Sequence, residues 1–176
     1  MKDESITMTG LMATMPQTGR LEWIGIREVK REPLTVLEQI EVIENRGLTG
    51  DHRSQRTGGK RQVTLIQAEH LPVLEAITGH DVIPPEWLRR NLMVSGINLY
   101  ALRKSRFMIG DVLLQGSGTC PPCSRMEKIL GPGGYNAMRG HGGINAQVIQ
   151  GGVIKLGDAV MHLPVEDPDK QVHSME

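Results

Sequence analysis

The sequence predicts a mainly β fold, a closed and mostly antiparallel β-barrel of about seven strands with a few short helices between them. The chain has 176 residues, enough for one domain with a continuous core. Its 21 Gly and 10 Pro indicate frequent turns, which favour short strands over long helices. The apolar runs are short, and closing such strands into a barrel leaves no unpaired strand edge.

Composition divides the chain into three parts. Residues 1–20 are polar with scattered methionines and no periodicity, so we expect a disordered N-terminal arm. Residues 21–163 contain all the predicted strands and form the barrel domain. Residues 164–176 are polar and predict a mobile C-terminal tail.

Charge and targeting signals narrow the class of protein. The chain carries 20 Lys and Arg against 20 Asp and Glu. This lack of a basic excess argues against nucleic acid or an anionic membrane as a partner. The N-terminus has no apolar segment typical of a signal peptide, and no window is long enough for a membrane span. We therefore expect a cytoplasmic protein.

The N-terminal half predicts four strands around one long loop. Residues 21–29 and 35–43 alternate apolar and polar side chains and are rich in β-branched residues. Residues 62–67 and 91–96 are short apolar runs typical of buried strands. Between the predicted strands at 35–43 and 62–67, residues 45–61 have no apolar run and are rich in glycine and basic side chains, so we expect a polar loop.

Three segments predict short helices. Residues 68–79 have apolar side chains at helical spacing, with Pro72 in the first turn and Gly79 at the end. Residues 84–90 begin with two prolines and are long enough for a second short helix. Residues 124–130 can form one or two turns before the following glycines stop them.

The C-terminal half contributes the remaining strands. Residues 107–118 predict either a strand pair around a turn at Gly110 and Asp111 or one bent strand. Residues 142–152 and 153–163 predict two strands that close the domain.

Both cysteines of the chain lie in one short motif, TCPPC. Pro121 and Pro122 each fix φ and disfavour helical backbone before them, so the turn between Cys120 and Cys123 is stiff. Cys123 is expected at the start of a helix, where the positive end of the helix dipole and the nearby Arg125 favour a thiolate. Such a thiolate can serve as a ligand or a nucleophile.

The spacing of the cysteines leaves several alternatives open. Both thiols can be ordinary buried cysteines, although a loop rich in Pro and Gly is an unusual place for these. A thioredoxin-like redox pair is disfavoured because the expected βαβ pattern is missing. A structural zinc needs four ligands, and His52 and His141 would have to complete the set without the usual local spacing.

Three further loops combine glycines with basic side chains. The basic residues are His52, Arg53, Arg56, Lys60, Arg61, Arg89, Arg90, Arg139 and His141. Exposed backbone amides with arginines nearby suit a phosphate or a polar heterocycle, and we expect these loops to gather with the cysteine turn at one mouth of the barrel. The glycine spacing matches neither a P-loop nor a dinucleotide fingerprint, so ATP and NAD sites are not supported.

The order of several motifs resembles that of the MOSC domain, the molybdenum cofactor sulfurase C-terminal domain. The motifs are GLTGD, RQVTLIQAE, LRRNLMVSGINL, FMIGDVLLQGSGTCPPC and GGINAQVIQGGVIKLGDAV. The resemblance extends from Trp23 to Leu163 and is strongest to stand-alone bacterial members. It implies a closed β-barrel and a role in handling the molybdenum–pterin cofactor or the sulfur attached to it.

The resemblance also implies site residues. In family members that carry the cofactor, the second cysteine of the motif ligates molybdenum, and this position is Cys123. The family's R-x-N motif lies near the cofactor and corresponds to Arg89 and Asn91. Gly50 and Asp51 match a family GD pair whose role is as readily structural as functional. Thiolate ligation suits molybdenum, and arginine forks suit the pterin phosphate.

The leading hypothesis is therefore a molybdopterin-binding MOSC protein with Cys123 as the molybdenum ligand. Lys60, Arg61 and His52 are expected to line the pocket with Arg89 and Asn91. Such a protein can support the reduction of N-oxygenated compounds with electrons from a donor protein.

Two other readings stay open. In the first, Cys123 carries a persulfide in a sulfur carrier or accessory protein that delivers sulfur to metal–sulfur centres. Its sulfur would come from a pyridoxal phosphate partner, because the sequence contains no such domain. In the second, the barrel binds another phosphate-bearing ligand and the cysteines are structural.

Overall fold

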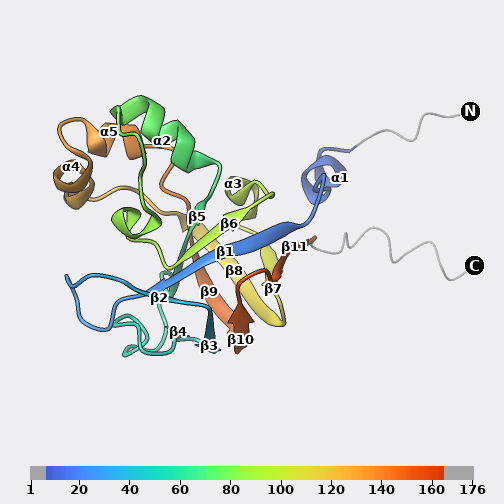
Figure 1. The fold of residues 1–176 in the computed structure, drawn as a ribbon. Coiled ribbons are helices and arrows are strands. Elements are labelled where there is room, and N and C mark those ends of the chain that lie inside the picture. Colours follow the sequence, from blue (N-terminus) through green and yellow to red (C-terminus); the bar gives the residue numbers. More distant parts are fainter. Residues whose placement is uncertain (1–6, 165–176) are drawn as a thin grey trace, which may run out of the picture.

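Seven strands close into a barrel, which confirms the predicted fold class (Figure 1). The computed structural model describes residues 7–164. In spatial order the barrel strands are β1 (Gly19–Ile26), β6 (Leu92–Ser95), β5 (Val63–Gln67), β9 (Ile144–Gln150), β8 (Val112–Thr119), β7 (Arg106–Ile109) and β11 (Ala159–Leu163), which pairs back onto β1. All neighbours are antiparallel except β5 and β6.

The remaining strands extend the barrel at one end. β2 (Thr35–Leu37) pairs with β1, and β3 (Gln39–Ile43) forms a small sheet with β4 (Gly47–Leu48) and β10 (Gly152–Lys155). Leu, Ile and Val side chains fill the interior, and the single Phe of the chain, Phe107, is fully buried among them. The scarcity of aromatic residues is thus met by close packing of branched aliphatic side chains.

Short helices gather beside the opposite end of the barrel (Figure 1). They include α2 (His70–Thr78), α4 (Ser124–Leu130), α5 (Gly134–Met138) and the 3₁₀ helix η1 (Pro85–Leu88). Buried side chains of these helices, such as Leu74, Leu88, Met126 and Met138, form a second core. Because α2 and η1 connect β5 to β6, the connection crosses over and the two strands can lie parallel.

Most of the predicted elements are present. α2 ends where Gly79 adopts φ +75°, and β7 and β8 form a hairpin around Gly110, which excludes a single bent strand. The predicted strand at 35–43 is two strands, β2 and β3, and the predicted loop at 45–61 contains β4. Helices α3 (Leu99–Leu102) and α5 were not predicted.

The N-terminal region departs from the predicted disordered arm. Met8–Ala13 form helix α1, and Thr7 caps this helix by accepting a hydrogen bond from the Gly10 amide. Met15 packs against the barrel core, and β1 begins at Gly19. Of the predicted C-terminal tail, residues 165–176 lie outside the part of the chain that the structure describes. Within residues 7–164, no helix is both long and apolar enough to cross a membrane.

Candidate functional site

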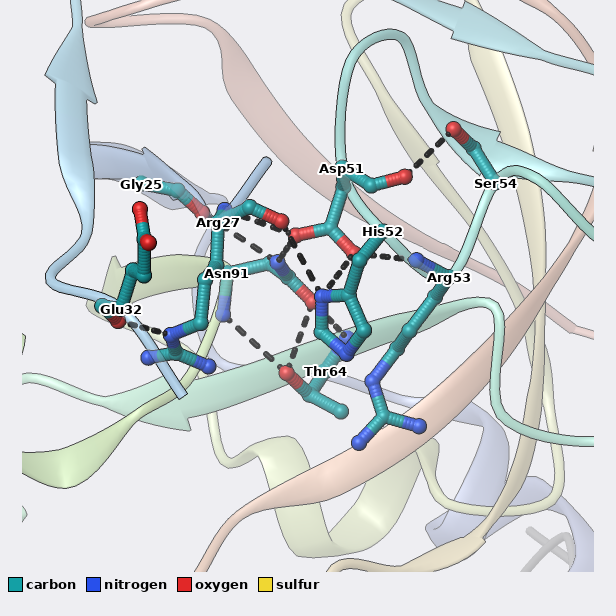
Figure 2. Close-up of polar contacts among 9 residues, drawn as sticks. All are labelled: Gly25, Arg27, Glu32, Asp51, His52, Arg53, Ser54, Thr64 and Asn91. Carbon is teal, nitrogen blue, oxygen red and sulfur yellow. Dashed lines mark hydrogen bonds and ion pairs between the residues drawn. The ribbon is translucent and has the colours of Figure 1, made fainter. Parts of the chain in front are cut away.

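A buried carboxylate organises the loop that follows β4. Asp51 Oδ2 accepts hydrogen bonds from the Arg27 backbone N–H at 3.0 Å and from Asn91 Nδ2 at 3.1 Å (Figure 2). Its Oδ1 accepts from the Arg53 backbone N–H at 2.9 Å. With three donors and a side chain almost fully buried, Asp51 holds its loop against the end of β1, so its role here is structural.

Asn91 is the second centre of this network. Its Oδ1 accepts from the N–H and hydroxyl of Thr64 at 3.2 and 2.9 Å, and its Nδ2 also donates to the Gly25 carbonyl at 3.2 Å. These partners come from β1, β5 and the Asp51 loop. Asn91 lies between the two strands because it immediately precedes β6, which pairs with β5 on one side and with β1 on the other. Asn91 was predicted to contact a cofactor, but both atoms of its amide bind protein groups (Figure 2).

The two consecutive arginines before Asn91 have different environments. Arg89 ends η1 with a left-handed backbone, φ +60°, and its side chain is half-buried. Arg90 is buried, and its guanidinium donates to the carbonyls of Leu88 at 2.9 Å, Gly142 at 2.7 Å and Cys120 at 3.3 Å. Burial lowers the pKa of Arg90, while the nearby Cys120 and Cys123 oppose this shift.

Side-chain hydrogen bonds to two consecutive backbone carbonyls hold the cysteine turn in place. Asn145 Nδ2 donates to the Thr119 carbonyl at 2.9 Å, and Arg90 binds the next carbonyl, that of Cys120. The Cys120 N–H donates in turn to the Gly143 carbonyl at 2.8 Å. Cys120 is buried, whereas Cys123 is exposed and immediately precedes α4, as predicted. The turn therefore presents one free thiol in a fixed position.

Positive charge surrounds this thiol. The pKa of Arg89 is lowered to about 10, first by burial and then by Arg27 and Arg125, while Cys123 acts in the opposite direction. Burial also lowers the pKa of Arg27. The negative charge of Asp51 opposes this shift, and the positive charge of Arg125 adds to it. Arg89 stays charged at neutral pH, because its pKa remains well above 7, and arginine side chains in proteins are in general protonated. Because the positive charges of Arg27, Arg89 and Arg125 repel one another, a bound anion would stabilise all three side chains.

A basic cleft of about 700 Å³ adjoins the Asp51 network. It is lined by the predicted residues His52, Lys60 and Arg61. His52 Nδ1 lies 3.0 Å from the Arg27 carbonyl, which fixes the ring beside the network. Arg53 also lines the cleft and acts electrostatically on both Arg27 and Arg90, so the cleft and the cysteine region share one positive field.

The structure groups the predicted residues into two adjacent sets. His52, Lys60 and Arg61 line the basic cleft, and Arg89 lies near Cys123. Asn91 lies beneath them as an internal support. The zinc alternative has no support in residues 7–164, where no group of three or more His, Cys, Asp and Glu side chains is placed to hold a metal ion.

Sequence reasoning missed the roles of Arg27 and Asn145. Arg27 belongs to the end of a predicted strand, and only the buried Asp51 beside it reveals its position. Asn145 lies in a strand of alternating pattern, where it gives no signal of its contact with Thr119. The supporting role of Arg90 was also missed, because its carbonyl partners Gly142 and Cys120 are distant from it in sequence.

Comparisons with known proteins identify the family. A profile of the MOSC domain matches residues 51–161, more than half of the chain. The YuaD protein from Bacillus subtilis is similar in structure, with a TM-score of 0.72 and 21% identity, over 87% of this chain and 100% of that one. YiiM from Geobacillus stearothermophilus has a TM-score of 0.66 and 17% identity, over 82% of this chain and 75% of its own. A search among curated proteins found no match.

YiiM from Escherichia coli is similar to the same degree, with a TM-score of 0.66 and 18% identity, over 86% of this chain and 73% of its own. At these identities the solved structures establish a shared fold. The family profile goes further, and the chain belongs to the MOSC domain family, which is associated with molybdenum cofactor binding.

Proposed function

We propose that this protein binds the molybdenum cofactor, with Cys123 as the molybdenum ligand. The observation that carries the proposal is a free, exposed thiol on a turn held by Arg90, close to Arg89, whose pKa is lowered by burial and by the neighbouring charges of Arg27 and Arg125. Molybdenum accepts soft thiolate ligands, and a fixed turn supplies one at little entropic cost.

The surroundings of Cys123 fit the rest of the cofactor. The pterin carries a phosphate and a ring edge rich in donors and acceptors, and arginine forks recognise both groups. The adjacent basic cleft has a volume of about 700 Å³, within the usual range for small-molecule sites. Arg53, Lys60 and Arg61 would hold the phosphate there, while Arg89 would lie beside the metal end.

Bound molybdenum would supply two-electron redox chemistry, which suits the reduction of N-oxygenated compounds with electrons from a donor protein. The chain's own residues have a narrower task. Cys123 fixes the position of the metal, and the arginines neutralise the anionic groups and orient them. The Asp51–Asn91 network keeps the loop that carries Arg53 in place.

The test is the molybdenum and pterin content of protein produced in a host that makes the cofactor. We expect near-stoichiometric molybdenum and pterin in the wild type and a loss of at least tenfold in Cys123→Ser. Cys120→Ala is the matched control, since this thiol is buried and we expect the cofactor to remain. Equal molybdenum in wild type and Cys123→Ser would refute the proposal.

One outcome would favour the sulfur-carrier alternative instead. A persulfide is also anionic, so the same arginines would stabilise it on Cys123. If the wild type contains cyanide-labile sulfur but no molybdenum, and Cys123→Ser contains neither, the protein carries sulfur rather than cofactor.

A further inference from the structure

A second cavity, of about 300 Å³, lies behind the cysteine turn. Cys120, Pro121 and Pro122 form one wall, and the lining ends one residue before Cys123. The other walls come from α3, α5 and the glycine-rich loop before β9. None of the residues predicted to bind the cofactor lines this cavity, so it is separate from the site proposed above.

The aromatic content of the cavity is unusual for this protein. The chain has only two tyrosines, and both Tyr100 and Tyr135 line this one cavity. Neither is needed for the core, since Tyr100 is 56% exposed and Tyr135 is 42% exposed. Exposed aromatic rings that face a shared cavity are typical of binding sites, because they offer a large and rigid contact area.

The walls are fixed before any ligand binds. Both carboxylate oxygens of Glu127 accept backbone hydrogen bonds at 2.8 Å, one from Gly133 and one from Tyr135, which sets the start of α5. Gln67 Oε1 accepts from the Leu99 N–H at 3.0 Å and sets the start of α3. Arg90 holds the remaining walls through its bonds to Cys120 and Gly142. The cavity is therefore preorganised, which reduces the entropic cost of binding.

The charge of the lining selects for an anion. Arg139 is the one Lys or Arg side chain in the lining, and no carboxylate lines the cavity. Within residues 7–164, its guanidinium has a single long contact, 3.5 Å from Nη1 to Asn136 Oδ1, so its donors are available to a ligand. Burial and the nearby His141 lower the pKa of His70, which leaves this lining residue neutral at pH 7.

We propose that this cavity binds a small aromatic carboxylate, with the ring against Tyr100 and Tyr135 and the carboxylate paired with Arg139. The aliphatic side chains of Leu99, Pro121 and Pro122 complete the apolar part of the site. The proposal does not depend on molybdenum at Cys123, because the cavity is built without that residue. A ligand bound here would contact Pro122, the residue immediately before Cys123.

The experiment is a titration of the metal-free protein followed by NMR of the backbone amides. Three probes separate the contributions: benzoate, benzamide with the same ring and no charge, and cyclohexanecarboxylate with the same charge and no aromatic ring. We expect benzoate to shift amides around Tyr100, Tyr135 and Gly143 at millimolar concentration, and both other probes to bind several-fold more weakly.

Variants assign the contacts. Arg139→Gln should weaken benzoate binding about tenfold and leave benzamide unchanged. Tyr135→Leu should weaken benzoate and leave cyclohexanecarboxylate unchanged. Arg46→Gln, at an exposed arginine outside both cavities, is the matched control and should bind benzoate like the wild type. Absence of benzoate shifts at these amides, or equal binding in wild type and Arg139→Gln, would overturn the proposal.

Discussion

Asn91→Ala tests the structural role assigned to the asparagine of the R-x-N motif. The substitution removes four side-chain hydrogen bonds: two from Thr64, one to Gly25 and one to the Asp51 carboxylate. It also leaves Asp51 with one donor fewer in a buried position. A variant that lacks this amide should therefore fold less stably even in the absence of any cofactor.

The magnitude follows from the number and kind of bonds. A net value of about 1 kcal/mol per hydrogen bond gives about 4 kcal/mol for the four. The bond to the carboxylate is worth more than the mean, whereas water entering the space left by the amide would recover part of the loss. We expect the free energy of unfolding to fall by about 3 to 5 kcal/mol.

Urea denaturation of the cofactor-free protein, followed by circular dichroism, measures this change. The control is Asn136→Ala, the same substitution at an exposed position with one long contact, and it should change the free energy of unfolding by less than about 0.5 kcal/mol. If Asn91→Ala is within about 1 kcal/mol of that control, the network does not stabilise the fold as argued.

Three other substitutions test separate features. Arg90→Lys should cost about 2 to 3 kcal/mol in urea denaturation and lower the molybdenum content, because a single ammonium nitrogen cannot reach all three carbonyls that the guanidinium binds through three separate nitrogens; unchanged stability would contradict this. The lowered pKa of His70 means that stability falls as the pH drops below 6.5, so His70→Gln should show a smaller decrease there than the wild type. Backbone hydrogen bonds from Tyr135 and Gly133 lower the pKa of Glu127, whose contribution is lost as the pH falls below 4.5; Glu127→Gln should flatten the acid side of the stability profile, and parallel profiles would refute this.

Elements set by local chemistry were predictable. Gly79 marked the end of α2 because it takes up a left-handed backbone, and Gly110 marked the turn between β7 and β8 for the same reason. The double proline likewise placed Cys123 immediately before a helix. In each case the residues that decide the structure are close together in the sequence.

Features set by distant pairings were not predictable. β4 is two residues long and exists because Val42 and Ile43 pair with it. The bond between Asp51 and Asn91 joins residues 40 apart in sequence, and that between Asn91 and Thr64 joins residues 27 apart. No local pattern indicates such partners, and the family resemblance implied a place for Asn91 near a cofactor rather than in the support beneath the site.

The choice between Arg89 and Arg90 illustrates the same limit within one motif. Both arginines precede β6, and composition does not distinguish them. The left-handed backbone at Arg89 turns the chain, so that Arg90 is buried against the cysteine turn while Arg89 stays half-exposed near Cys123. The family resemblance selected Arg89, and the geometry adds Arg90 as the residue that positions the thiol.

Direct binding of molybdenum by Cys123 can be measured on the protein itself. X-ray absorption spectroscopy at the molybdenum edge, on wild-type protein loaded with cofactor, counts the sulfur atoms bound to the metal. We expect one more bound sulfur than in the free cofactor, contributed by the Cys123 thiolate. The same number of sulfur atoms in the protein-bound and free cofactor would contradict it.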